Sequence, residues 1–267
     1  MTMTASGFGR LSDQRRLVLD LAWRDISQKY RGAFLGLSWG FFQPLLSLAV
    51  FSTVFGVFLQ VRWAGTQSTF EFALFLFCGL IPFNFASECL QRAPTLILSN
   101  PSYVKKIVFP LHVLPWVSVL VAGFQVLLSI IVWLIFCVFI RGGIEVTALL
   151  VPVVLLPLVV WAVAFGWFFA ALGVYVRDAA QFVSILTPML MFLSPVLYPV
   201  DAVPEAYRLW IYLNPVTPVV EQMRVVLLAG NVPDFTALTV TCLIGLLVAI
   251  LSLAWFQKLR QGFADVI

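Results

Sequence analysis

The sequence comprises 267 residues, of which 62% are hydrophobic and 10% are charged, and its mean hydropathy is +1.03. Soluble domains carry about 45–50% apolar and about 25% charged residues. The composition therefore excludes an ordinary soluble domain and indicates an integral membrane protein. Basic residues that flank the membrane spans account for the net charge of +4. We therefore expect no nucleic-acid partner.

Six long stretches with few charges are the candidate membrane spans. A helix needs about 20 apolar residues to cross the hydrocarbon core, whereas a barrel strand would show alternation over about 10 residues. Because lipid offers the backbone no hydrogen-bonding partner, the pattern predicts an all-α integral membrane protein, with a single transmembrane domain over residues 1–267. The six stretches are 32–61, 72–87, 107–140, 146–176, 179–200 and 235–257.

The distribution of Lys and Arg predicts the orientation of the chain. Most of the 16 basic residues fall on the side of the two termini, and cytoplasmic segments of membrane proteins are rich in Lys and Arg. Both termini are therefore expected in the cytoplasm. Residues 1–31 carry charges throughout and lack the apolar region of a cleavable signal peptide. The basic residues expected on the outer side are Arg62, Arg141, Arg208 and Arg224.

Sequence motifs for catalysis or metal binding are missing. No G-x-x-x-x-G-K-[ST] loop is present to hold nucleotide phosphates, and no nucleophile elbow indicates a hydrolase. The single histidine, His112, has no second ligand at metal-binding spacing. We expect no catalytic residue, no metal site and no cofactor in this chain. The cysteines show no C-x-x-C spacing and are expected to pack as small apolar residues; they are Cys78, Cys89, Cys137 and Cys242.

One acidic residue, Glu88, lies inside a predicted span. Charged groups are costly in lipid and often mark an ion or proton pathway. Arg92 follows four residues later, where the two side chains share a helix face, so a structural ion pair is the simpler interpretation. A proton-coupled carrier would bury more charge than this, so we expect the energy source to lie outside this chain.

Residues 10–31 have the pattern of an amphipathic helix. Apolar side chains recur at spacings of three and four residues, which place them on one face of a helix. Most of the basic side chains lie on its other faces. Such a helix lies along a membrane surface, either as an anchor without a partner or as an interface for another protein. The apolar positions are Leu19, Ala22, Trp23, Ile26 and Tyr30, and the basic positions are Arg15, Arg16, Arg24 and Lys29.

Residues 99–108 form a short basic segment between two spans. Asn100 can cap a helix that has Pro101 at its first position, and Pro110 prevents the helix from continuing. Tyr103 is the expected anchor if this helix binds a partner, since aromatic residues dominate interfaces. The alternative is a positively charged segment that only fixes the topology. Its lysines are Lys105 and Lys106.

Residues 204–230 contain two apolar stretches separated by Asn214 and Pro215. Each stretch is too short to cross a membrane, and the Asn-Pro step interrupts the backbone. The pattern predicts two short helices that dip into the outer leaflet, or else a plain amphipathic loop. Glu221 and Arg224, three residues apart, are expected to pair on one face of the second helix.

Prolines and aromatic rings concentrate in two of the predicted spans. Prolines inside a span predict kinks that can line a cavity, although proline is common in membrane helices. Pro44, next to the polar Gln43, predicts a similar kink in the first span. Aromatic faces can stack on sugar rings. The prolines of 179–200 are Pro188, Pro195 and Pro199, and the rings of the first span are Trp39, Phe41, Phe42, Phe51, Phe55 and Phe58.

Six runs occur in order over nearly the whole chain. They are "YRGAFLGLSWGFFQPLL" at 30–46, "GLIPFNFAS" at 79–87, "KKIVFPLHVLP" at 105–115, "VRDAAQFVSILTPMLMFLSPVLYPVDAVPEAY" at 176–207, "LNPVTPVVEQMR" at 213–224 and the tail "FQKLRQGFADVI". Together, and at these distances from the spans, they resemble the membrane subunits of type-2 ABC exporters for polysaccharide, the Wzm family of O-antigen permeases. Teichoic acid permeases share the pattern.

The resemblance implies a homodimer of six-helix permeases bound to two cytoplasmic ATPase subunits, which supply the ATP and Mg²⁺ site. It makes 10–31 an interface helix, 99–108 a coupling helix that docks in the ATPase, and 204–230 a pair of periplasmic gate helices. The implied docking residues are Asn100, Pro101, Ser102, Tyr103, Lys105 and Lys106. The implied interface residues are Trp23, Arg24, Ile26 and Tyr30, and the gate residues are Asn214, Pro215, Glu221 and Arg224.

The resemblance also implies the substrate, which is a long glycan on an undecaprenyl diphosphate lipid. Such a substrate crosses the bacterial inner membrane through a channel at the dimer interface. A diphosphate needs cations at the inner mouth of the channel. The candidates are Arg24, Lys29, Arg31 and Arg177, and the candidates for the channel lining are Trp39, Phe42, Phe51, Phe55 and Tyr198.

Other functions remain open from the sequence. An ABC exporter of a drug or small lipid, or of capsule or teichoic acid, would share most of these features, and no residue identifies the sugar. A secondary carrier would show inverted repeats, which the sequence lacks. A membrane glycosyltransferase would need clustered acids, and the acids expected outside are scattered: Glu71, Glu145, Asp201, Glu205, Glu221 and Asp234.

Overall fold

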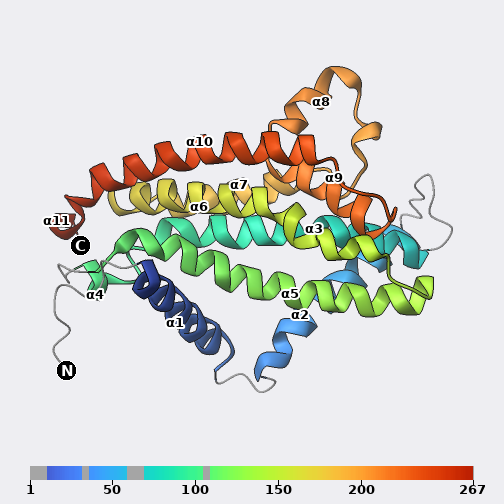
Figure 1. The fold of residues 1–267 in the computed structure, drawn as a ribbon, viewed down its shortest axis with the longest axis horizontal. Helices are drawn as coiled ribbons and strands as arrows, with labels where there is room; N and C mark the ends of the chain where they lie inside the picture. Colours follow the sequence, from blue (N-terminus) through green and yellow to red (C-terminus); the bar gives the residue numbers. More distant parts are fainter. Residues whose placement is uncertain (1–10, 32–35, 59–68, 105–108, 267) are drawn as a thin grey trace.

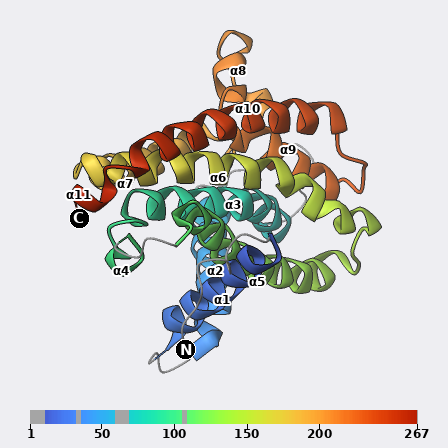
Figure 2. The same cartoon turned by 60° about the vertical axis from the view of Figure 1, so that its left-hand side comes forward.

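The computed structural model describes residues 11–31, 36–58, 69–104 and 109–266. Every regular element in this part of the chain is helical, as the composition predicts. The α-helices are α1 (Leu11–Tyr30), α2 (Trp39–Phe51), α3 (Thr69–Arg92), α4 (Pro101–Val104), α5 (Leu114–Arg141), α6 (Val151–Tyr175), α7 (Ala179–Leu193), α8 (Glu205–Tyr212), α9 (Val216–Leu227), α10 (Phe235–Arg260) and α11 (Phe263–Val266). They form an elongated bundle with α4 and α11 at one end and α8 projecting near the other (Figures 1 and 2).

Four helices among the described residues are long and apolar enough to cross a membrane: Phe70–Thr95, Leu111–Arg141, Val146–Tyr175 and Phe235–Arg260. They coincide with four of the six predicted spans. The other two predicted spans contain shorter apolar helices, Trp39–Val54 and Ala179–Leu193. The chain is therefore a multi-pass helical membrane protein, and among the described residues the apolar α-helices within the first and fifth predicted spans are shorter than the other four.

The shortness of α7 has a local cause at its C-terminal end. Ser194 adopts an extended backbone with φ −97° and ψ 146°, and Pro195 follows it. Proline disfavours a helical conformation in the preceding residue and lacks an N–H. Pro188 lies inside α7, but the kinks predicted at Pro195 and Pro199 are wrong, because both residues lie beyond the end of the helix.

Helix α2 ends in a π-helical segment, η2 (Ser52–Phe58). The Thr53 hydroxyl donates a 2.8 Å hydrogen bond to the carbonyl of Ala49, one turn earlier, and Ser52 bonds in the same way to Leu48. Such bonds from Ser or Thr to the preceding turn bend helices, and π-helical turns often occur at functional sites. The first predicted span therefore continues beyond α2 with altered helical geometry.

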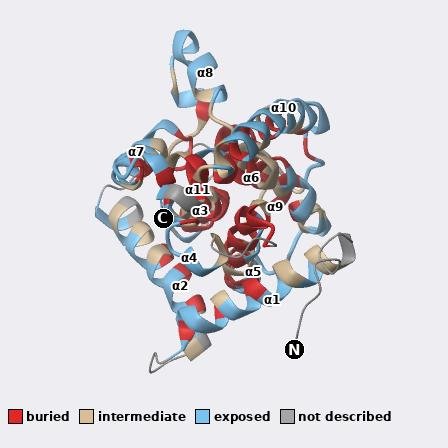
Figure 3. Ribbon diagram, turned by 90° about the vertical axis from the view of Figure 1, so that its left-hand side faces the viewer, coloured by how far each residue is buried: buried red, intermediate tan, exposed pale blue. Residues whose placement is uncertain are grey.

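Helix α3 lies at the centre of the bundle (Figure 3), in contact with α2, α5, α6, α7 and α9. Leu74, Phe77 and Ile81 are at most 1% exposed. The Trp133 indole N–H of α5 donates a 3.1 Å hydrogen bond to the Leu74 carbonyl, which satisfies a polar group that would be costly to bury alone. The central position of α3 means that any polar residue on it must face another helix, a cavity or an opening at the surface.

Helix α6 passes very close to the turn that follows α3. A Cβ atom added at Gly173 would collide with the backbone carbonyl of Pro94. The absence of a side chain at Gly173 lets the two backbones approach, and Pro94 is itself buried. This contact holds the end of α3 nearest to α4 against α6.

We expect Gly173→Ala to lower the free energy of unfolding by about 3 kcal/mol, because a rigid backbone atom blocks the added methyl group. Gly123→Ala is the matched control, since a Cβ atom there would meet nothing within 4 Å and alanine favours a helix by up to about 1 kcal/mol. Thermal unfolding of the detergent-solubilised protein measures both. Equal unfolding temperatures for the two variants would contradict the close approach.

Candidate functional site

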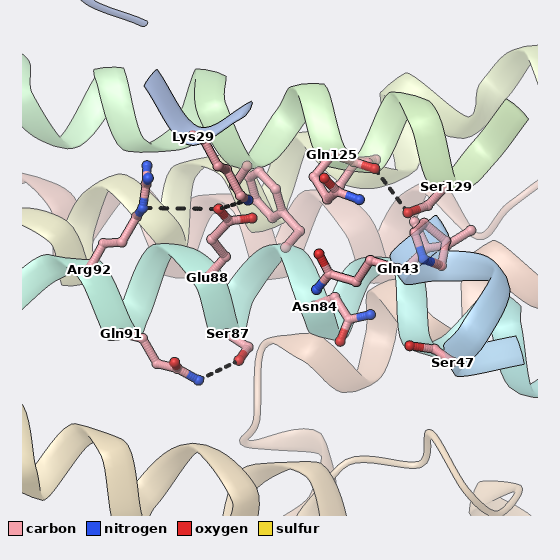
Figure 4. A pocket seen from close by; sticks show the side chains of 15 residues that line it. Lys29, Gln43, Ser47, Asn84, Ser87, Glu88, Gln91, Arg92, Gln125 and Ser129 are labelled. Carbon is pink, nitrogen blue, oxygen red and sulfur yellow. Dashed lines mark hydrogen bonds and ion pairs between the residues drawn. The ribbon is translucent and has the colours of Figure 1, made fainter. Parts of the chain in front are cut away.

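A polar cavity of about 400 Å³ lies between α1, α2, α3 and α5 (Figure 4). Its volume is within the range of ligand sites in proteins. Amide and hydroxyl side chains dominate its lining, in a bundle whose composition is otherwise strongly apolar. The uncharged polar residues of the lining are Gln43, Ser47, Asn84, Ser87, Gln91, Gln125 and Ser129.

One face of α3 supplies much of this lining. Asn84, Ser87, Glu88, Gln91 and Arg92 recur at spacings of three and four residues, which place them on one side of a helix. Asn84 and Gln91 are exposed, and the others are half-buried. Of this set, the sequence pattern predicts a contact only for Glu88 and Arg92. The polar spacing within an apolar run was the signal that could have identified the other three.

The charged residues cluster at one end of the cavity. Lys29 Nζ lies 2.9 Å from Glu88 Oε1, and Arg92 Nε lies 4.0 Å from the same oxygen. The predicted pairing of Glu88 with Arg92 is therefore present, but Lys29 of α1 is the closer partner. This ion pair joins α1 to α3 across 59 positions of the chain. The spacing of Glu88 and Arg92 on one helix could not predict it.

A second set of hydrogen bonds closes the wall of the cavity formed by α1 and α5. The Tyr30 hydroxyl donates to Gln125 Oε1 at 2.9 Å, and Gln125 Nε2 donates to the carbonyl of Gly40 at 2.9 Å. The Gln125 side chain is thus bonded through both its oxygen and its nitrogen. Tyr30, predicted as a contact with the ATPase subunit, is instead buried within this chain.

The rest of the α1 prediction divides between two faces of the helix. Ala22 and Ile26 are buried with Tyr30, whereas Leu19 is 59% and Trp23 is 64% exposed. The predicted apolar stripe therefore does not act as one surface: part of it packs against the bundle, and Leu19 and Trp23, four residues apart, form an outward apolar patch. Leu19 and Trp23 remain available to a membrane surface or to a partner.

Tyr103 connects α4 to two other elements at the same end of the bundle. Arg24 of α1 donates a 2.6 Å hydrogen bond to the Tyr103 hydroxyl, and this bond raises the pKa of the Arg24 guanidinium. The Tyr103 ring stacks on Phe109 with centroids 4.3 Å apart. Arg260 of α10 donates to the Phe109 carbonyl at 3.3 Å. Helices α1, α4 and α10 therefore meet around one aromatic pair.

The predicted docking segment is helical from Pro101, its expected first position. The Asn100 carbonyl accepts from the Tyr103 N–H at 3.0 Å, but the Asn100 side chain donates to Leu96 of the preceding turn. Pro101 and Ser102 are exposed. Lys105 and Lys106 lie outside the described residues.

The other predicted contact residues are spread over the surface. Arg31 and Arg177 are exposed. Trp39 and Phe42 are 45% and 42% exposed and contact each other edge-on, with ring centroids 6.2 Å apart. Phe51 is half-buried, and the side chain of Phe55 lies outside the described part of the chain. The Tyr198 hydroxyl donates to the Phe192 carbonyl at 2.9 Å.

The 204–230 segment contains the two predicted short helices, α8 and α9, and they differ in environment. No residue of α8 is buried, whereas α9 is largely buried against α3 and α6. At the break between them, Asn214 donates to Ser194 at 2.7 Å and accepts from the Val216 N–H at 3.0 Å. Asn214 thus ties the start of α9 to the end of α7.

Arg224 anchors α9 in the core. It is 8% exposed, donates a 2.8 Å hydrogen bond to the Val196 carbonyl, and its guanidinium lies 3.8 Å from the Phe75 ring centroid. Burial lowers the pKa of Arg224 to about 10 and raises the pKa of Glu221. The attraction between these two charges opposes both shifts, as expected for side chains that share a helix face.

Long apolar helices around a polar cavity are the arrangement of a helical membrane protein with a polar site in its bundle. Residues 16–228 match the ABC-2 type transporter family. The chain therefore belongs to the ABC-2 type transporter family, as the sequence resemblance predicted. Members of this family are membrane subunits, and the ATPase is a separate subunit.

Relatives of known type align with the chain from end to end. It is 25% identical over 253 residues to the O-antigen export system permease protein RfbA of Klebsiella pneumoniae, covering 94% of this chain and 95% of the relative. It is 27% identical over 259 residues to the same-named protein of Myxococcus xanthus, covering 96% and 97%. It is 25% identical over 266 residues to the polysialic acid transport protein KpsM of Escherichia coli, covering 97% and 98%.

We expect Lys29→Glu or Glu88→Lys alone to destabilise the contact between α1 and α3, and the two together to restore it. Both side chains are partly exposed, so the coupling free energy should be about 1 kcal/mol. A double-mutant cycle of thermal unfolding in detergent measures it. Lys258→Glu, an exposed position on α10, is the control with the same net charge. Equal rescue of Glu88→Lys by Lys258→Glu would contradict a direct pair.

We expect Arg224→Lys to lower the free energy of unfolding by about 2 kcal/mol. Lysine keeps the charge but loses the planar stacking on Phe75 and the geometry of the bond to Val196. Arg208→Lys is the control on the less buried α8, where the arginine donates to Val203, and it should cost less than about 1 kcal/mol. If the Arg208 variant is the less stable of the two, Arg224 does not anchor α9.

Proposed function

We propose that the chain is the permease subunit of an ATP-driven exporter that moves polysaccharide on a lipid carrier, undecaprenyl diphosphate, across the bacterial inner membrane. The polar face of α3 carries this proposal. An apolar membrane bundle has no structural need for five polar residues on one helix face, and such residues usually mark a transport pathway. The end-to-end similarity to O-antigen and polysialic acid transport proteins supports a glycan as the cargo.

The exposed part of this face requires a polar environment. Asn84 and Gln91 are exposed on α3, which contacts both α2 and α7, and Figure 3 shows these two helices flanking α3 on one side of the bundle. Contact with lipid would leave the Asn84 amide without a partner and the Gln91 amide with only its bond to Ser87. A second copy of the chain placed against this side would enclose them in a shared channel, with Trp39, Phe42 and Tyr198 as aromatic candidates for its wall.

The end of the bundle that holds α4 and α11 is the proposed cytoplasmic end, with both termini in the cytoplasm. There, α4 with Tyr103 would dock on the ATPase subunit, and the outward patch of α1 at Leu19 and Trp23 would lie beside it. The bond between Arg24 and Tyr103 gives a direct route by which movement of α4 reaches α1. ATP and Mg²⁺ would be held entirely by the partner subunit.

The lipid diphosphate would meet cations near this cytoplasmic end. Of the four candidates, Lys29 is already paired with Glu88, and Arg24 contacts both Tyr103 and Asp25. Arg31 and Arg177 are exposed and are the better candidates. At the opposite end, α8 with its exposed Tyr207 and Trp210 would form a movable exit gate, while the anchored α9 would serve as its base.

Two related functions compete with O-antigen export. Similarity to KpsM also fits a capsule exporter, and teichoic acid export would use the same architecture. An exporter of a drug or small lipid belongs to the same family, but it would have no use for a cavity rich in amides. Transport of a defined glycan by the reconstituted complex distinguishes these cases.

We expect the ATPase encoded with this chain to co-purify with the wild-type permease but not with a variant carrying Tyr103→Ala, Lys105→Glu and Lys106→Glu. Loss of a central aromatic contact weakens an interface by about 2 kcal/mol or more, which is about 30-fold in Kd. The control carries Tyr207→Ala and Glu205→Lys on α8, at the opposite end. If the triple variant retains the ATPase as well as the wild type does, α4 is not the docking helix.

A further inference from the structure

Three side chains at the uncharged end of the cavity have no partner within the described part of the chain. They are Gln43 and Ser47 of α2 and Asn84 of α3. Figure 4 shows them on neighbouring turns of the two helices, with no hydrogen bond drawn to any of them. By contrast, Gln91 donates to Ser87 at 3.1 Å.

Gln43 and Asn84 are exposed and Ser47 is half-buried, in a bundle whose composition is otherwise strongly apolar. An amide or hydroxyl in such a place needs a polar partner. The charged residues of the cavity lie at its other end, where Glu88 is occupied by Lys29 and Arg92. The region around Gln43, Ser47 and Asn84 is therefore polar but uncharged, which does not favour an ion.

Two amides and a hydroxyl each donate and accept hydrogen bonds. The hydroxyls of a sugar do the same, so the two sets of groups are chemically complementary. The cavity of about 400 Å³ falls within the volume range of small-ligand sites. A few neutral hydrogen bonds also give weak binding, which suits a polymer that must leave each site as readily as it enters.

We propose that Gln43, Ser47 and Asn84 form a saccharide-binding site that takes the hydroxyls of one neutral sugar unit of the exported polymer. This inference rests on the proposed function and adds to it a specific site within each protomer. The site is separate from the aromatic candidates Trp39 and Phe42 and from the cations proposed for the diphosphate. It recognises the sugar and not the lipid headgroup.

The test uses the full-length permease with its ATPase in lipid nanodiscs. The probe is the lipid-free repeat-unit oligosaccharide released from the polysaccharide of the same organism, and its Kd is measured by ligand-observed NMR. We expect Asn84→Leu and Gln43→Leu each to raise the Kd about tenfold and Ser47→Ala about threefold. Thr53→Val is the control, because its hydroxyl already donates to Ala49 and lies outside this cavity.

A second measurement remains informative if the leucine variants fold poorly. Asn84→Cys, in a chain that also carries Cys242→Ala, is labelled with a water-soluble thiol reagent. The oligosaccharide should slow this labelling about tenfold at saturation, and undecaprenyl diphosphate without sugar should not. Protection by the sugar-free lipid instead would overturn the saccharide assignment, and so would labelling that the oligosaccharide leaves unchanged.

Two further outcomes would also refute the proposed saccharide-binding site. One is an unchanged Kd in both leucine variants. The other is dissociation of the dimer in these variants without loss of sugar binding, which would make the three residues a contact between copies. In either case export by the wild type leaves the proposed function intact. A wild-type complex that neither binds the oligosaccharide nor exports glycan would instead refute the proposed function itself, and the site with it.

Discussion

A polar side chain inside a membrane protein needs a polar partner, and the polar face of α3 imposes this requirement on the rest of the bundle. The lipid cannot satisfy Asn84, Glu88 or Gln91. The protein satisfies Glu88 with two cations and Gln91 with a bond to Ser87, and it places this face along a cavity that α1, α2 and α5 also line. Helix α1, outside the set of long spans, packs against α5 with Ala22, Ile26 and Tyr30 buried, and this position also brings its Lys29 to the charge on α3.

Besides its packing on α5 and the bond of Tyr30 to Gln125, helix α1 has two polar contacts with other helices, five residues apart. Arg24 holds α4 through Tyr103, and Lys29 holds α3 through Glu88. At 1.5 Å per residue the two contacts are separated by about 7.5 Å along the helix axis. A displacement of α4 thus reaches the mouth of the polar cavity through one short rigid element, without passing through the apolar core.

The opposite end of the bundle combines a fixed helix with an exposed one. Arg224 buries its charge in α9 by using the carbonyl of Val196 and the face of Phe75, so moving α9 would separate a buried cation from its partners, which is costly. No residue of α8 is buried, and it has no comparable anchor. Motion at this end is therefore expected in α8.

The sequence by itself determined the membrane class, the helical fold, the start of α4 at Pro101 and the presence of two short helices around Asn214, and it predicted six spans, of which four are long helices among the described residues. Composition and local periodicity encode these features, because they depend on neighbouring residues. Only the tertiary structure decided that Lys29 meets Glu88 and that Tyr30 meets Gln125. It also decided that Asn84 lines a cavity with Gln43. Such contacts join residues far apart in the chain, and packing geometry, which local patterns do not contain, selects them.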